Sequence, residues 1–136
     1  MKLSLNKILI IICFLSVSYS DVYDGYFLFA PSSSNEDSVS TLLMDNEYDV
    51  IHSWEHTLLP ASMPYLLTDS TLIYPYKVSN PTMAAGGVGG GVKKITWDGT
   101  VLWDYVFSDE NYQHHHDVEP LPNGNVLIIV WDRKTA

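Results

Sequence analysis

Short runs of apolar and β-branched residues, separated by polar turns, make up the sequence after residue 20. No stretch of this region repeats at the helical spacing of about 3.6 residues, whereas short runs bounded by Pro, Gly, Asn or Asp are typical of strands. Asp98-Gly99 and Asn123-Gly124 supply the positive φ angles of tight hairpin turns. The pattern predicts an antiparallel all-β fold with strands near residues 26–30, 39–44, 49–54, 65–67, 72–76, 92–97, 101–107, 117–121 and 126–131.

The predicted strands follow one another in an order that repeats. Residues 42–54 and 95–105 both consist of a strand, an acidic turn and a strand with an aromatic end, and residues 67–73 and 121–127 both place a tight polar turn between apolar runs. A four-stranded unit that recurs after roughly fifty residues is the signature of a β-propeller blade. We therefore expect residues 21–136 to hold one blade and most of a second, the N-terminal part of a propeller domain whose ring is not closed.

Residues 1–20 have the order of a secretory signal peptide. Lys2 and Lys7 flank the start of an almost wholly apolar stretch at residues 8–17, and small residues stand at Ser18 and Ser20. The apolar stretch has about ten residues, half of what a membrane-spanning helix needs, so an anchor is the weaker interpretation. We expect cleavage after Ser20, export to the periplasm or the medium, and no stable membrane span in the mature chain.

Composition narrows the possible partners and compartments. The formal net charge is −9, and the 12% of aromatic residues against 17% of charged ones is the opposite of a disordered composition. An acidic surface repels the nucleic-acid backbone, so we expect no nucleic-acid partner. The single cysteine, Cys13, lies in the predicted signal peptide, and its removal would leave no disulfide and no thiolate chemistry.

The run His114-His115-His116-Asp117 is the most informative local feature. In a regular strand His114 and His116 would share one face and His115 would take the other. Imidazoles beside an acid can bind an anionic ester or move protons; they can also ligate a metal, although adjacent ligands in one strand rarely complete a zinc site. A His-rich polar loop without a function is the remaining interpretation. The equivalent place in the first unit, Ala61-Ser62-Met63, has no histidine, and this favours function because an architectural requirement would repeat.

Other conspicuous residues predict structure rather than chemistry. The glycine-rich stretch at residues 86–91 lacks the Gly-Lys-Ser/Thr ending of a phosphate-binding loop, and no helix is predicted after it. It predicts a flexible connection or a close approach of the backbone near the propeller axis. His52 and His56 stand at a strand end and are interpreted as structural. Three tyrosines in predicted strands are expected to pack in the core rather than to line a pocket for an aromatic ring: Tyr65, Tyr74 and Tyr76.

Taken together, four segments resemble the bacterial aryl-sulfate sulfotransferase family. Residues 25–31 look like its Gly-Tyr-x-Leu-Phe-x-Pro opening, and residues 52–54 look like its Val-His-x-Trp strand. Residues 95–103, after the glycine run, are similar to its Trp-Asp-Gly-x-Val-x-Trp segment. Residues 115–127 are similar to its most specific motif, His-His-Asp-(Ile/Val)-x-x-Leu-Pro-Asn-Gly-Asn-x-Leu. The resemblance covers residues 25–136.

This resemblance implies an exported six-bladed propeller that transfers a sulfuryl group from a phenolic sulfate ester to a phenol. A histidine near the propeller axis would attack sulfur and carry the group as sulfohistidine, and neither a cofactor nor a metal is implied. That nucleophile and an arginine would lie in later blades, beyond Ala136, so no catalytic residue is expected in this chain and the chain alone should not catalyse transfer. His115 and His116 match the family's substrate-side histidines and are expected to bind the sulfate.

Two other functions compete with this expectation. A non-catalytic exported propeller that binds a ligand or a protein partner is the main alternative, because propellers host many unrelated functions. A metal-dependent hydrolase is the third candidate. Axial histidines and an arginine in later blades would favour the sulfotransferase over a binding module.

Overall fold

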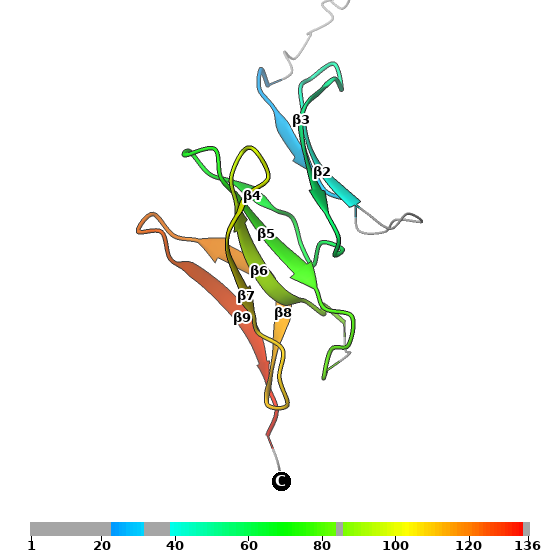
Figure 1. Ribbon diagram of the computed structural model, residues 1–136, viewed down its shortest axis with the longest axis vertical. Helices are drawn as coiled ribbons and strands as arrows, with labels where there is room; N and C mark the ends of the chain where they lie inside the picture. Colours follow the sequence, from blue (N-terminus) through cyan, green and yellow to red (C-terminus); the bar gives the residue numbers. More distant parts are fainter. Residues whose placement is uncertain (1–22, 32–38, 84–85, 135–136) are drawn as a thin grey trace, which may run out of the picture.

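Every regular element that the structure describes is a β-strand. The computed structural model describes residues 23–31, 39–83 and 86–134, and these ranges hold no helix, so the predicted all-β class is confirmed (Figure 1). The strands are β1 (Phe27–Phe29), β2 (Val39–Met44), β3 (Val50–His56), β4 (Tyr65–Leu66), β5 (Leu72–Lys77), β6 (Gly90–Ile95), β7 (Val101–Val106), β8 (Tyr112–Pro120) and β9 (Val126–Asp132). Consequently, none of these ranges contains a helix long and apolar enough to cross a membrane. The predicted signal peptide at residues 1–20, with Cys13, lies outside the described residues.

The strands form three antiparallel sheets, none of which closes on itself. Their strand orders are β1-β2-β3, β4-β5-β6-β7 and β8-β9, so sequential strands are always neighbours within a sheet. The four-stranded sheet joins the second hairpin of the first sequence unit to the first hairpin of the second unit. Between β3 and β4 the chain leaves its own sheet, and Ala61 N–H donates to the Pro75 carbonyl of β5 at 2.9 Å. The sheet boundaries therefore cut across the units read from the sequence.

Four hairpin turns share one backbone pattern, which confirms the repeat of the hairpins. Asp45, Leu67, Thr96 and Leu121 each open a turn by donating N–H to the carbonyl four residues on and accepting from the N–H three residues on, all at 2.8 to 3.1 Å. The residue three places after each opening has a positive φ: Tyr48, Ser70, Gly99 and Gly124. Equivalent turns lie about fifty residues apart, as in a solenoid or propeller repeat. The same local geometry is therefore built at all four of these turns.

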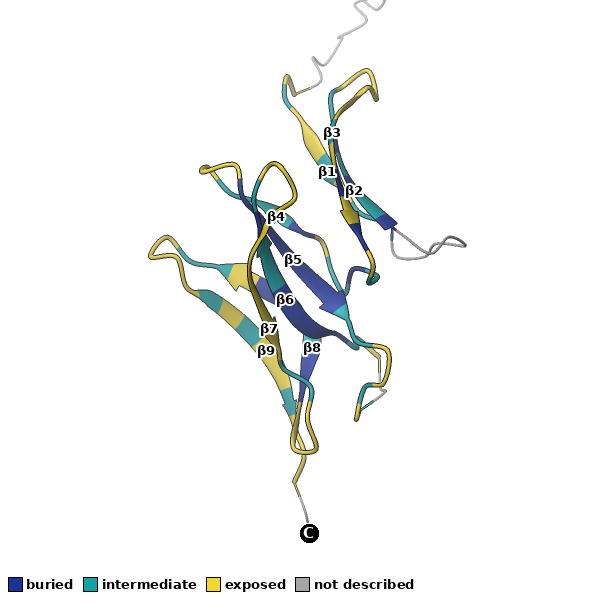
Figure 2. Cartoon of the chain, in the orientation of Figure 1, coloured by how far each residue is buried: buried dark blue, intermediate teal, exposed yellow. Residues whose placement is uncertain are grey.

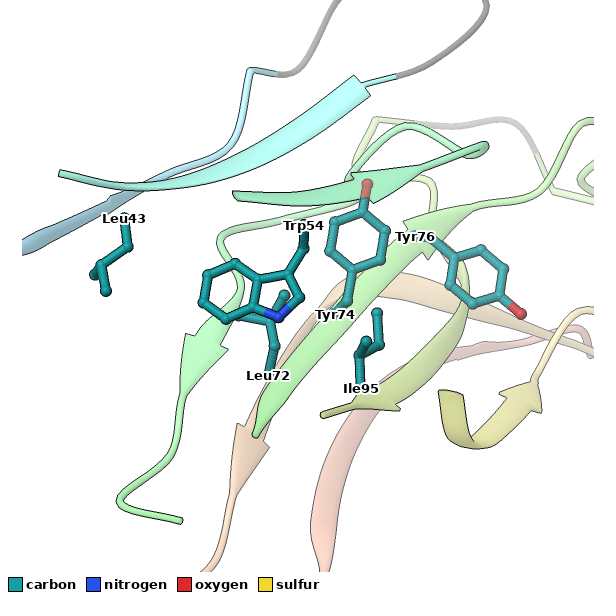
Figure 3. Packing of buried hydrophobic residues seen from close by; sticks show 6 residues of the cluster. All are labelled: Leu43, Trp54, Leu72, Tyr74, Tyr76 and Ile95. Atoms are coloured by element: carbon teal, nitrogen blue, oxygen red, sulfur yellow. The ribbon is translucent and has the colours of Figure 1, made fainter. Parts of the chain in front are cut away.

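Strand β5 is buried on both faces and joins two hydrophobic cores. Leu72 and Tyr74 face the first sheet and pack with Trp54 of β3, as Figure 3 shows. Ile73, on the opposite face, packs with Val92 of β6 and Val118 of β8. Because side chains alternate along a strand, one strand can contribute to both cores. The three sheets are thus layered, with the four-stranded sheet in the middle (Figure 2).

His52 and His56 stabilise the interface between the three-stranded and the four-stranded sheet. The His52 ring stacks on Trp97 with centroids 3.9 Å apart, and its Nε2–H donates to the Trp97 carbonyl at 2.8 Å. The His56 ring stacks on Tyr74 at 3.6 Å and its Nε2 is hydrogen-bonded to Thr41 Oγ1 at 2.9 Å. Both histidines are therefore structural, as expected, and the burial of Tyr74 and Tyr76 confirms that these two tyrosines pack in the core.

We expect the fold to lose stability as the pH falls from about 6.5 to 4, because unfolding lets His56 take up a proton. Burial, assisted by the charge of Lys93, lowers the pKa of His56 from 6.5 to about 4. A histidine with a depressed pKa in the folded state stabilises the fold fully above its unfolded pKa, and this contribution, roughly 3 kcal/mol, disappears as the pH falls to 4. Urea unfolding at pH 7 and pH 4.5 measures the loss. H56Q should flatten the pH dependence, and an unchanged slope would contradict the assignment.

Candidate functional site

The His114–Asp117 motif lies in a wide bulge of β8. His114 pairs with Val130 of β9 and Val118 pairs with Ile128, so residues 115–117 stand opposite Ile129 alone. Within the bulge, His116 has a φ of 155°. Such bulges interrupt the ladder and redirect side chains. The motif therefore lies within strand β8, but in a part of the strand that no longer alternates.

The expectation that His115 points away from His116 is wrong. The ring centroids of His115 and His116 are only 4.3 Å apart, with a tilt of 56° between the rings. Neighbours in a regular strand point to opposite faces, and the extra residues of the bulge remove that alternation. Two imidazoles are thereby brought side by side, which the strand pattern alone does not predict.

His114 is separated from this pair and has a structural role. It is fully buried, and its Nδ1 accepts a hydrogen bond from the Gly90 N–H at 3.2 Å. Because Nδ1 accepts, Nε2 carries the proton and lies 3.4 Å from the Asp117 carbonyl, across the bulge. Burial is the main cause that lowers the pKa of His114. The neutral ring thus links β8 to the start of β6.

His115 and His116 keep polar atoms that no described residue satisfies. The Nδ1 atom of each is shielded from solvent and has no hydrogen-bond partner in residues 23–31, 39–83 and 86–134. The other side of the His115 ring stacks on Trp131 of β9, with centroids 5.2 Å apart. A shielded polar atom without a partner costs free energy, about 1–3 kcal/mol in mutational data. The two Nδ1 atoms are therefore the unsatisfied polar atoms of this region, and a ligand could reach them only if the segments around the rings moved apart.

The glycine run lies against the histidines, so its backbone does approach other residues closely. A Cβ at Gly87, where φ is 81°, would lie 2.8 Å from His115 Nε2 and 2.9 Å from His116 Cδ2. A Cβ at Gly89 would overlap the His114 ring. Only glycine leaves room for the three rings at this place. The run therefore acts as a backbone wall of the site rather than as a phosphate-binding loop.

Two polar residues that the sequence did not single out hold the bulge in place. Gln113 is fully buried; its amide donates to the Gly89 carbonyl at 3.0 Å and its Oε1 accepts from Ser108 Oγ at 2.7 Å. Ser62 Oγ donates to Asp117 Oδ1 at 3.1 Å. Ser62 comes from the place in the first unit that is equivalent to the histidine run, so the two equivalent segments touch. Gln113 stands directly before the histidine run, and this position was the one sequence signal that could have predicted its role. Ser62 had no such signal.

The chemistry open to the site follows from these geometries. Two adjacent imidazoles can donate N–H groups to an oxyanion or exchange a proton with a bound molecule. In the part of the chain that the structure describes, no three His, Cys, Asp or Glu side chains converge in a metal-ligand arrangement. Comparisons with protein-family models, with curated proteins and with solved structures find no match to this chain.

We expect G89A to destabilise the chain, because the added methyl group would collide with the His114 ring. Overpacking of this kind costs typically 1–3 kcal/mol. G86A is the matched control, since a Cβ at Gly86 meets no atom within 4 Å. Urea unfolding measures both free energies of unfolding. Equal stability of the two variants would show that the glycine run does not press on the histidines.

Proposed function

We propose that the sheets are successive blades of a β-propeller. The support comes from β5, which contributes one face to each of two cores, so that three sheets are layered as neighbouring blades would be. The repeated hairpins add to this, because equivalent turns have the same hydrogen bonds and the same positive φ position. In this proposal the four-stranded sheet β4–β7 is one blade, and the other two sheets belong to the blades on either side.

We further propose that the protein is exported and acts in aryl-sulfate sulfotransfer, with His115 and His116 on the sulfate. One observation carries the proposal: two neighbouring imidazoles hold shielded Nδ1 atoms for which the described part of the chain supplies no partner. The motif of residues 115–127, with its resemblance to the aryl-sulfate sulfotransferases, indicates which anion the pair would receive. A sulfate ester offers several acceptor oxygens, and in this proposal both rings carry a proton on Nδ1 and donate it once the ester reaches them.

The proposed reaction assigns the pair a supporting part in two steps. In the first, a histidine nitrogen outside the described residues attacks sulfur, the ester S–O bond breaks and the phenolate leaves. In the second, the acceptor phenol oxygen attacks sulfur, the N–S bond breaks and the phenol proton passes to a base or to water. N–H groups of His115 and His116 stabilise the sulfate oxygens throughout. Donors aimed in advance at a charged group are a strong source of such stabilisation.

Binding by this chain is the first test. We expect the chain to bind 4-nitrophenyl sulfate, and we expect H115A or H116A to weaken binding about tenfold, because each loses a charge-assisted or neutral N–H donor. H52Q is the control, because His52 is held by Trp97 in another part of the fold. Isothermal titration calorimetry at pH 6 measures the dissociation constants. Unchanged affinity in both alanine variants would refute the assignment of this site.

Transfer is a separate test, because the same geometry could hold an ester without transferring its sulfuryl group. In a longer protein of the same family, replacing the histidines that match His115 and His116 with Ala should slow transfer from 4-nitrophenyl sulfate to phenol about a hundredfold. Release of 4-nitrophenolate reports the rate. Wild-type rates in both variants, with binding by this chain intact, would leave a binding propeller as the function.

A further inference from the structure

An open cleft lies between β7 and β9, beside the second core, and Val92 belongs to both. Its volume is about 450 Å³, and its walls include Trp103 and Tyr105 of β7 and Val126 and Ile128 of β9. Tyr105 is 52% exposed, although it lies on the face of β7 that is turned toward another sheet. Strand β9 pairs with β8 on one edge, and no described strand pairs with its other edge. An apolar cleft beside a free strand edge is a binding surface in many proteins.

The internal repeat shows what covers the equivalent surface one interface earlier. Counted from the opening of the preceding turn, Trp54 of β3 stands at the position of Tyr105, and His52 stands at the position of Trp103. Trp54 is only 2% exposed. It donates its Nε1–H to the Thr96 carbonyl at 3.0 Å, and His52 donates to the Trp97 carbonyl at 2.8 Å. The cover is thus the end of β6 and the turn that follows it.

The strand residues beneath the two surfaces also match, and this supports treating the β7–β9 cleft as the equivalent of the β3–β5 interface. Leu72 and Tyr74 of β5 occupy the positions that Val126 and Ile128 occupy in β9, again counted from the preceding turn. Next to Leu72 and Tyr74 lies Ile95 of β6, which fills the first core and whose strand pairs with the edge of β5. At the second interface the floor and the free edge are present, but no described strand takes the place of β6.

We propose that the β7–β9 cleft and the free edge of β9 form a docking site for a β-hairpin of the same repeat. Its first strand would pair antiparallel with β9, as β6 pairs with β5, and would place an apolar residue in the cleft. Its turn would present backbone carbonyls to the Trp103 Nε1–H and the Tyr105 hydroxyl, as Thr96 and Trp97 do to Trp54 and His52. Both side chains are donors, so the recognition chemistry of the earlier interface is preserved. The partner is therefore an extended polypeptide rather than a small aromatic molecule.

This inference rests on the layered-sheet part of the proposed function and not on sulfate binding. Hairpin docking uses the outer side of β9, whereas the histidine pair lies in β8. Because the His115 ring also stacks on Trp131 of β9, H116A is the variant that should leave hairpin docking unchanged. A chain that docks the hairpin and ignores 4-nitrophenyl sulfate would refute the sulfate site alone, and the reverse result would refute the docking site alone.

The test uses the full chain and a fluorescent synthetic peptide of residues 90–107, which carries the β6–β7 hairpin. We expect saturable binding in an anisotropy titration, and hydrogen exchange should slow at the backbone amides of β9 when the peptide is added. The double variant W103A/Y105A should bind at least about tenfold more weakly, because it removes both donors and the aromatic wall. V106A is the matched control, since Val106 is exposed and lies on the opposite face of β7 from Tyr105, where its pairing partner is Gly91. A peptide carrying I95D should bind at least about tenfold more weakly to the unaltered chain.

Several results would overturn the proposal. Circular dichroism must first show that W103A/Y105A remains folded. If it does not fold, the I95D peptide tests the same interface with the unaltered chain. Absence of binding at about 1 mM peptide to a folded chain would reject the site. Protection of β5 rather than β9 would mean that the peptide displaces the chain's own hairpin. Self-association that peptide does not reverse would assign the surface to a second copy, and this also contradicts the proposal.

Discussion

The burial of β5 on both faces is the constraint on which the rest of the structure depends. Leu72 and Tyr74 close the core toward the first sheet, and Ile73 closes the core toward β8 and β9. A fully buried side chain of this size contributes about 2 kcal/mol, so a strand with two apolar faces stabilises both neighbours at once. The second core also positions the site, because Val118 anchors β8 directly after the bulge. The histidines therefore lie where they do because β8 must cover β5 and β6.

The bulge in β8 places the rings of His115 and His116 side by side. His114 is held by Gly90 and spans the bulge to Asp117, so the rings of the next two residues are free to lie together against the glycine run. Gln113 ties the same strand to Gly89, and Ser62 ties Asp117 to the loop between β3 and β4. Buried, well-paired polar groups thus surround two imidazoles whose Nδ1 atoms have no partner among the residues that the structure describes.

Local patterns predicted most of the strands, and nonlocal packing explains the differences. Asp98-Gly99 and Asn123-Gly124 placed two hairpin turns correctly, since positive φ is a property of a few residues. The strand predicted at 117–121 begins instead at Tyr112, because the backbone pairing between β8 and β9 continues on the N-terminal side of the bulge. The pairing of His115 with His116 could not be predicted, because it depends on extra residues that only the register reveals. Ser62 is part of this region because it hydrogen-bonds to Asp117, a residue distant in the sequence. A single sequence carries no signal for such a contact.

Nitrogen-15 NMR of the histidine rings, during titration with 4-nitrophenyl sulfate, tests the paired-imidazole site most directly. The Nδ1 signals of His115 and His116 should move to values typical of a protonated, donating nitrogen. The Nδ1 signal of His114 should stay where it is, because this atom already accepts from the Gly90 N–H. Movement confined to His114, or unchanged Nδ1 signals of His115 and His116 at saturating ester, would contradict the site.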